Sequence, residues 1–148
     1  MAVQAENYQK KIRLNLPKIR QIARTIIRRK GIAQATLTVV FVTATKIRAL
    51  NRKFLKRTYT TDVLAFDLGT SRKCLAGDVI ISVDAASANA KTYGTGVSQE
   101  LALYLVHGIL HLLGYDDHRK KDIVRMRREE KKLMAFIGPK IPSIVMKK

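Results

Sequence analysis

Strand-like and helix-like segments alternate irregularly along this chain of 148 residues, without the regular strand–helix–strand repeat of a doubly wound sheet. Alternating or β-branched runs predict four strands, at residues 12–16, 36–43, 63–66 and 79–83. Strands and helices mixed in this order favour the α+β fold class.

Apolar side chains at helical spacing predict four helices. The first begins near Pro17, which suits a first turn, and Gly31 can end it. A strongly apolar helix is predicted from about Ser98 to Leu113. The two others are a short helix marked by Ile47, Leu50 and Phe54, and a last helix whose apolar face carries Ile123, Met126, Leu133 and Ile137.

Size and composition limit the class of protein. The length fits one domain, residues 1–148, and is sufficient to enclose a core. The single Cys74 excludes an internal disulfide, which suits a reducing cytosol. No apolar run reaches the roughly 18 residues of a membrane span, and the N-terminal segment lacks the apolar region of a secretory signal. We therefore expect a single-domain cytoplasmic protein that does not bind membranes.

The charge of the chain is large and unevenly distributed. Lys and Arg number 29 against 11 Asp and Glu, which gives a formal net charge of +18. Residues 1–60 carry +14, residues 61–118 carry −4 and residues 119–148 carry +8. Basic flanks around an acidic middle favour a polyanionic partner, and nucleic acid is the commonest one because counterion release drives its binding.

Three arginines on the first predicted helix are candidate RNA contacts. Arg20, Arg24 and Arg28 follow one another at four-residue spacing, opposite the apolar stripe of that helix. Like charges at this spacing repel one another mildly, so the row is unfavourable without an anion nearby. The alternative is a solvated helix face.

All three histidines of the chain fall within twelve residues, which is the pattern of a metal site. His107 and His111 are four residues apart on a predicted helix, so their imidazoles leave the same face and can share one ion. Gly114 is placed to end this helix and turn the chain back. His118 can then return to the same ion, which predicts the ligand set His107, His111 and His118.

Three neutral imidazoles leave one position of a tetrahedral Zn²⁺ site open for water, as in catalytic zinc sites. The sequence therefore predicts one Zn²⁺ per chain. A structural site would need a fourth protein ligand, and Cys74 is the only thiol available. Gly108 stands where the HExxH metalloproteases carry their general-base Glu, so a peptidase is disfavoured. A metal-bound hydroxide remains a competent nucleophile near neutral pH.

Three ordered sequence blocks resemble those of the YbeY family, which are bacterial metal-dependent endoribonucleases. The run His107-Gly-x-Leu-His111-Leu-x-Gly114-Tyr115-Asp116 is similar to the family signature. Leu50-Asn51-x-x-Phe54, followed by Thr61-Asp62-Val63-Leu64-Ala65-Phe66, resembles the family's LN..Y and TDVLSF motifs. Gly77-Asp78-Val79-x-Ile81-Ser82 resembles its GDI.IS strand. The resemblance runs in order from about Ile12 to Ile137.

This resemblance implies an α+β fold in which a small mixed β-sheet packs with helices and a central helix presents His107 and His111. It also implies cleavage of single-stranded RNA, chiefly in 3′-end maturation of small-subunit ribosomal RNA and in ribosome quality control. The expected partners are therefore single-stranded RNA, ribosomal RNA and the small ribosomal subunit. The alternative function is a non-catalytic, RNA-binding ribosome-assembly factor with a structural metal.

The histidine block departs from the family pattern at its third ligand. The family usually places that His six residues after the second, where this chain has Asp117, and His118 is the seventh. Either His118 reaches the ion through one extra loop residue, or Asp117 replaces it in a site of two histidines and one carboxylate. We favour His118, because a loop absorbs one residue easily and imidazole suits Zn²⁺.

A second departure concerns an Arg that the family places directly after the aromatic residue of LN..Y. Here Leu55 occupies that position, and Lys56 and Arg57 follow. Arg57 is the candidate to take over the phosphate contact, with Lys56 beside it, and a merely solvated residue is the alternative. The candidate catalytic residues are thus His107 and Arg57, and the candidate substrate-binding residues are Arg20, Arg24, Arg28 and Lys56.

Three further residues are candidates for a role near the metal or the RNA. Asp62 can hold an imidazole N–H near the metal, or it can act only in a turn and a helix cap. Tyr104 and Tyr115 can stack on RNA bases. Tyr104, inside an apolar helix, is expected in the core instead.

Overall fold

The computed structural model describes residues 1–55 and 61–146 of the chain. Its helices and strands follow one another as β1 (Ala2–Asn7), α1 (Leu16–Arg29), β2 (Gln34–Val42), α2 (Ala44–Leu55), β3 (Val63–Asp67), β4 (Cys74–Ser82), α3 (Val83–Tyr93), α4 (Val97–Leu112), α5 (Lys120–Ile137) and the short 3₁₀ helix η1 (Gly138–Ser143).

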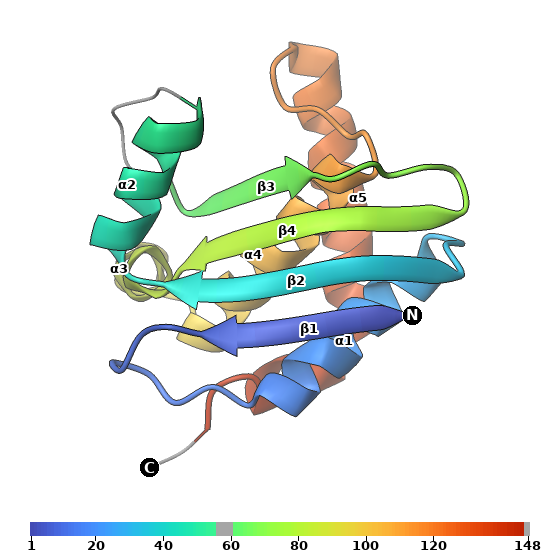
Figure 1. Ribbon diagram of the computed structural model, residues 1–148. Coiled ribbons are helices and arrows are strands. Elements are labelled where there is room, and N and C mark those ends of the chain that lie inside the picture. Colours follow the sequence, from blue (N-terminus) through green and yellow to red (C-terminus); the bar gives the residue numbers. More distant parts are fainter. Residues whose placement is uncertain (56–60, 147–148) are drawn as a thin grey trace.

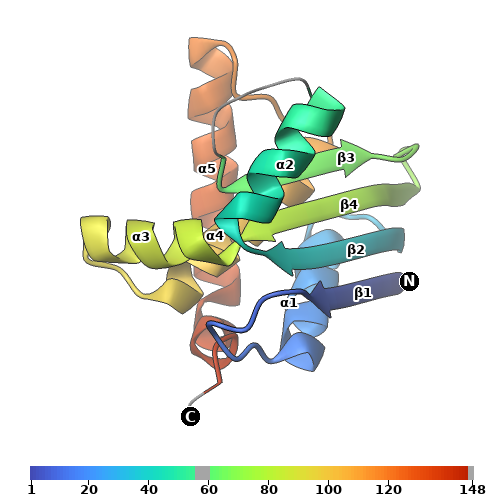
Figure 2. The same cartoon turned by 60° about the vertical axis from the view of Figure 1, so that its left-hand side comes forward.

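The strands form one mixed sheet in the order β1-β2-β4-β3. β1 pairs with β2 and β2 with β4 in parallel, whereas β3 pairs antiparallel with β4. Helices α1, α4 and α5 lie over one face of this sheet, and α2 lies against the opposite face near β3 and β4 (Figures 1 and 2). The predicted α+β class with a small mixed sheet packed by helices is confirmed.

Alternation along the strands explains why this face holds the core. In β2, Ala35, Leu37, Val39 and Phe41 are buried in turn, while the residues between them point to the other face. The buried side chains of β2 belong to the same core cluster as the apolar stripe of α1, which includes Ile22. The main hydrophobic core therefore lies between the sheet and the layer of α1, α4 and α5.

The strand predicted at residues 12–16 is wrong. Within that segment Leu14 makes only an isolated bridge to Val145. The side chain of Asn15 accepts the Lys18 N–H and so caps α1, which turns the chain into a helix before a strand can extend. The first strand is instead β1, at one edge of the sheet. Its burial pattern shows only Val3 fully buried, so its sequence carries a weak strand signal.

The other predicted strands and helices agree with the structure at their centres and differ at their ends, whereas helix α3 was not predicted. β4 begins at Cys74, earlier than predicted, because its first residues already pair with the start of β2. The Ala-rich segment before the apolar helix forms α3, which the Ser82 side chain caps and Gly94 ends with φ +67°. Among the described residues, no helix combines the length and the apolar character needed to cross a membrane.

Candidate metal centre and active site

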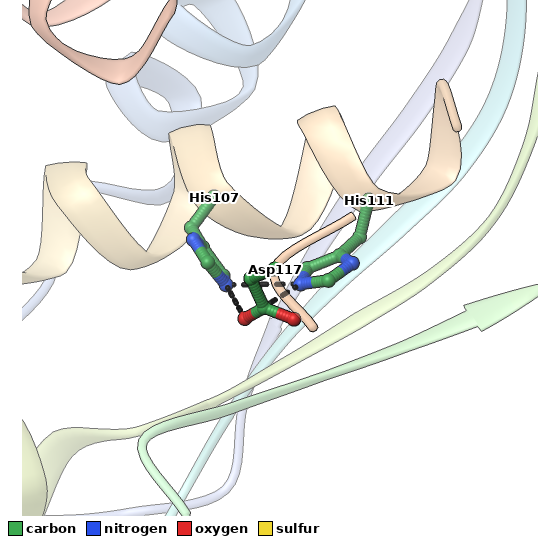
Figure 3. Close-up of side chains that lie close together, drawn as sticks. All are labelled: His107, His111 and Asp117. Atoms are coloured by element: carbon green, nitrogen blue, oxygen red, sulfur yellow. Dashed lines mark hydrogen bonds and ion pairs between the residues drawn. The ribbon is translucent and has the colours of Figure 1, made fainter. Parts of the chain in front are cut away.

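The two histidines of the HxxxH motif project together from α4. His107 and His111 lie one turn apart near the C-terminal end of this helix, and both point away from it in the same direction (Figure 3). Gly108 lies between them and faces β4, where a Cβ atom would approach Val79 Cγ1 to 2.5 Å. The glycine thus allows α4 to pack closely on the sheet, which fixes the position of both imidazoles.

Gly114 ends α4 and turns the chain back, as the sequence predicts. Its φ of +96° is in the left-handed region that favours glycine. Its N–H donates to the His111 carbonyl at 3.0 Å, and the Tyr115 N–H donates to the Leu110 carbonyl at 3.0 Å. These two bonds form a Schellman motif, which starts the loop that returns toward the histidines.

The returning loop places Asp117 opposite the two imidazoles (Figure 3). The Nε2 atoms of His107 and His111 are 3.0 Å apart. Asp117 Oδ2 is 3.5 Å from each of these nitrogens. Two nitrogens and one oxygen therefore converge on one point in space.

This convergence fits a divalent metal ion. Ligand atoms bound to one tetrahedral zinc at about 2.0–2.1 Å lie roughly 3.3 Å from each other. The three observed separations of 3.0, 3.5 and 3.5 Å bracket that value. Cys74, the alternative fourth ligand, belongs to neither group of potential metal ligands found among the described residues.

His118, the third ligand predicted from the sequence, follows Asp117 on the same loop and lines one cavity with the other two histidines. Its Nδ1 atom pairs with Asp116 Oδ1, and its side chain is 72% exposed. It belongs to a second, exposed group of potential metal ligands with Asp116 and Asp117. The structure thus brings His107 and His111 together with Asp117, and not with His118.

Glu130 of α5 contacts the His107 ring on the side opposite Asp117, and the sequence analysis did not identify it. Its Oε2 atom is 2.8 Å from His107 Nδ1. A proton on Nδ1 donated to this carboxylate leaves the lone pair of Nε2 facing His111 and Asp117, as a metal ligand requires. One signal was available, because Glu130 falls four residues after Met126 on the buried face of that helix.

The electrostatic environment differs between the two histidines. Burial lowers the pKa of His107, but the hydrogen bond and charge of Glu130, together with the charges of Asp117 and Asp62, outweigh it, so the net pKa is raised. Burial and then repulsion by His107 lower the pKa of His111 below its ordinary value. The two imidazoles therefore differ in how readily each takes up a proton.

His107 and His111 line a cavity of about 640 Å³ between α4 and the strand β3. Residues of separate sequence blocks meet in its wall, since Asn51 of α2 and Thr61 and Asp62 before β3 line it with the histidines. Of the described residues that line it, four carry carboxylates and none is Lys or Arg. The four are Asp62, Asp67, Asp117 and Glu130. An anionic substrate therefore meets negative charge here unless a cation is bound.

The tyrosines considered for base stacking have other contacts. Tyr104 is buried in the core, as expected, and its hydroxyl accepts a hydrogen bond from the Asn89 amide at 2.6 Å. Burial raises the pKa of Tyr104 to about 12. The Tyr115 ring lies beside the Lys30 ammonium and the Arg125 guanidinium, 4.9 and 4.8 Å from the ring centre.

The predicted RNA contacts lie outside the lining of this cavity or outside the described residues. Arg20, Arg24 and Arg28 lie on α1, and none of them lines the cavity as described. Lys56 and Arg57 fall in residues 56–60, outside the described part of the chain. A smaller neighbouring cavity of about 260 Å³ is lined by His107, Asp117, Glu130, Ile123, Met126 and Arg127. Among the described residues that line this smaller cavity, Arg127 is the one Lys or Arg.

Fold and site together define an α+β protein with a candidate hydrolytic metal centre. The family model described as Endoribonuclease YbeY matches residues 4–138. A protein of Syntrophus aciditrophicus named Endoribonuclease YbeY is 31% identical over 144 residues, which are 93% of this chain and 90% of the relative. The chain therefore belongs to the endoribonuclease YbeY family, a family of enzymes that hydrolyse RNA.

Other relatives carry the same family name, and one solved structure has a similar fold. A Geobacter metallireducens protein of the same name is 32% identical over 144 residues. The matched region covers 93% of this chain and 96% of that relative. A protein of the same name from Anaeromyxobacter dehalogenans is 40% identical over 82% of this chain. The matched region covers 64% of that relative, which is longer. The solution structure of TM1509 from Thermotoga maritima superimposes with a TM-score of 0.61 at 20% identity, covering 93% of this chain and 92% of that one. This last likeness supports the fold alone.

Proposed function

We propose that this chain is a zinc-dependent endoribonuclease specific for single-stranded RNA. The observation that carries the proposal is the convergence of His107, His111 and a loop carboxylate in a cavity without Lys or Arg among its described lining residues. The family supplies the substrate class, because the matching relatives are named endoribonucleases. Its proposed biological role is 3′-end maturation of small-subunit ribosomal RNA and ribosome quality control.

Each residue of the site has a proposed task. His107 and His111 hold the ion together with a third ligand from the return loop, and Glu130 fixes the orientation of the His107 ring. When bound, the zinc ion supplies a Lewis acid for the phosphodiester and lowers the pKa of a coordinated water. Arg57, beside Lys56, is proposed to contact the reacting phosphate.

The basic flanks are proposed to attract the substrate to this acidic cavity. Arg20, Arg24 and Arg28 supply part of that charge on α1. Affinity for single-stranded RNA should then fall with salt, with a slope in log–log form of about −0.7 per phosphate contact. A flat salt dependence would contradict this role and point to a protein partner. We also propose that the chain works as a single domain in the cytoplasm, on the small ribosomal subunit.

Cleavage and metal content of purified protein test the proposal together. The zinc-loaded protein should cut an unstructured RNA and spare the same sequence closed into a duplex. The double variant His107→Ala, His111→Ala should lose both bound zinc and cleavage. Near-stoichiometric zinc in that variant would refute the site.

Chelation separates the enzyme from a structural metalloprotein. Removing the ion with EDTA should abolish cleavage and lower the melting temperature only slightly, because the hydrophobic core of α1, α4 and the sheet is built from apolar side chains and not from the proposed ligands. Unfolding on chelation, with no cleavage by the loaded protein, would instead identify a non-catalytic assembly factor with a structural metal.

A further inference from the structure

We infer that Asp117 is the third metal ligand, so that this chain binds its divalent cation through two imidazole nitrogens and one carboxylate oxygen. The inference rests on the proposed function only in requiring that a metal is bound at His107 and His111. It changes the ligand set expected from the resemblance, in which all three ligands are histidines.

The first support is the position of the Asp117 carboxylate. Its Oδ2 atom is 3.5 Å from the Nε2 atoms of both His107 and His111, so it completes a nearly equilateral triangle of donor atoms. A carboxylate is the third protein ligand in established zinc sites with two histidines. No rearrangement of the loop is needed to bring this oxygen to a shared ion.

The second support is what holds His118 away. Asp116 Oδ1 accepts hydrogen bonds from the backbone N–H of Asp117 at 2.7 Å and of His118 at 3.3 Å. The same oxygen pairs with Nδ1 of the His118 ring. The Asp116 carboxylate therefore holds His118 by both its backbone and its ring. In this arrangement His118 does not belong to the group of donor atoms that His107, His111 and Asp117 form.

The third support comes from the chain itself. Asp117 stands six residues after His111, one residue beyond the Tyr115-Asp116 pair that follows the Gly114 turn. The turn is formed by the hydrogen bonds of the Schellman motif, so the number of residues after it determines which side chain faces α4. In this chain that side chain is a carboxylate.

A carboxylate ligand has a consequence for the choice of metal. Two neutral histidines and one carboxylate leave a divalent ion with a net charge of +1, whereas three neutral histidines leave +2. Oxygen donors suit harder ions such as Mn²⁺ better than a third imidazole does. We therefore expect this site to discriminate less strongly between Zn²⁺ and Mn²⁺ than its three-histidine counterpart.

Metal affinities of the metal-free full-length protein test the inference. The dissociation constants for Zn²⁺ and Mn²⁺ are measured by chelator competition for the wild type, Asp117→Asn, and the matched neighbour His118→Gln. Asp117→Asn should weaken Zn²⁺ binding by more than the roughly 10–100-fold that is typical of outer partners. His118→Gln should change it by less than about threefold. The opposite ranking, or equal losses in the two variants, would overturn the assignment.

A third variant guards against simple loss of folding. Asp117→His should keep tight Zn²⁺ binding and lower the affinity for Mn²⁺ relative to Zn²⁺ by about tenfold or more. Unchanged affinities for both ions in Asp117→His would overturn the inference even if Asp117→Asn does not fold. Failure of the wild type to bind either ion would instead refute the proposed metal-dependent function.

Discussion

Glu130→Gln is the substitution that best isolates the role of the carboxylate behind the metal site. Glutamine keeps the size of the side chain and can still accept a hydrogen bond from His107 Nδ1, which lies 2.8 Å from Glu130 Oε2. What it removes is the negative charge. The prediction therefore concerns how strongly that charge stabilises His107 as a ligand.

The size of the effect follows from the hydrogen bond. Both side chains are mostly shielded, with 22% of His107 and 15% of Glu130 exposed. A hydrogen bond to a charged group contributes about 1.5–3 kcal/mol and a neutral one about 0.5–1.5 kcal/mol. Glu130→Gln should thus weaken zinc binding by about 1–1.5 kcal/mol, or roughly tenfold. Glu130→Ala leaves the Nδ1 donor without this acceptor and should cost roughly 30–100-fold.

Zinc affinity by chelator competition at pH 7.5 measures this loss. The matched control is Glu129→Gln, because Glu129 lies next in the same helix and pairs with Lys30 at 3.1 Å rather than with His107. Glu129→Gln should leave zinc affinity unchanged. Wild-type affinity in Glu130→Gln, or an equal loss in Glu129→Gln, would refute the reasoning.

Three further predictions concern other contacts. Asp84→Asn should cost about 1–2 kcal/mol at neutral pH, because the Asp84 carboxylate accepts the Ala44 N–H at 2.6 Å. This bond lowers the pKa of Asp84, so its stabilisation is present above the unfolded pKa and disappears as pH falls through the folded one. Melting curves that differ equally at pH 2 and pH 7 would contradict it. Gly108→Ala should destabilise by up to about 2 kcal/mol, because overpacking against Val79 costs about 1–3 kcal/mol and the helix preference of alanine offsets roughly 1 kcal/mol of it. Adding Val79→Ala should recover part of the loss in urea unfolding, and no recovery would disprove the clash. Arg57→Ala should lower kcat far more than RNA affinity, by roughly two to three decades. A larger kcat loss in Arg127→Ala would instead assign the phosphate contact to α5, where Arg127 lines the smaller cavity.

The helix that carries the histidines was predictable because several independent signals agree on it. The apolar run predicted from Ser98 to Leu113 became α4 within one residue at each end. Gly114 at its end has the positive φ that makes glycine informative in a sequence. Such an element is determined locally, by side-chain pattern and a stop signal.

The ligand set and the supporting carboxylate were less predictable because they depend on tertiary contacts. The direction of the return loop is set by hydrogen bonds to Asp116, which no hydrophobic period encodes. Glu130 lies in a helix rich in Lys and Arg, where a single Glu is usually part of a solvated face. Only its position on the apolar side of α5 distinguishes it. β1 was missed for the related reason that pairing with β2, rather than its own pattern, makes it a strand.

The two signs of charge in this protein have separate consequences for an RNA substrate. The flanks carry +14 and +8 and attract a polyanion from a distance, which depends on net charge and not on geometry. The described wall of the cavity has the opposite sign, because its carboxylates outnumber its cationic side chains. A phosphate that is drawn to the surface is therefore repelled at the last step unless the site holds a divalent ion. Since one of those carboxylates is Asp117 and another supports His107, the charges that repel an RNA phosphate in the metal-free protein are the same groups that favour the cation. The proposed function therefore predicts that metal binding and productive RNA binding are coupled through the composition of the cavity wall.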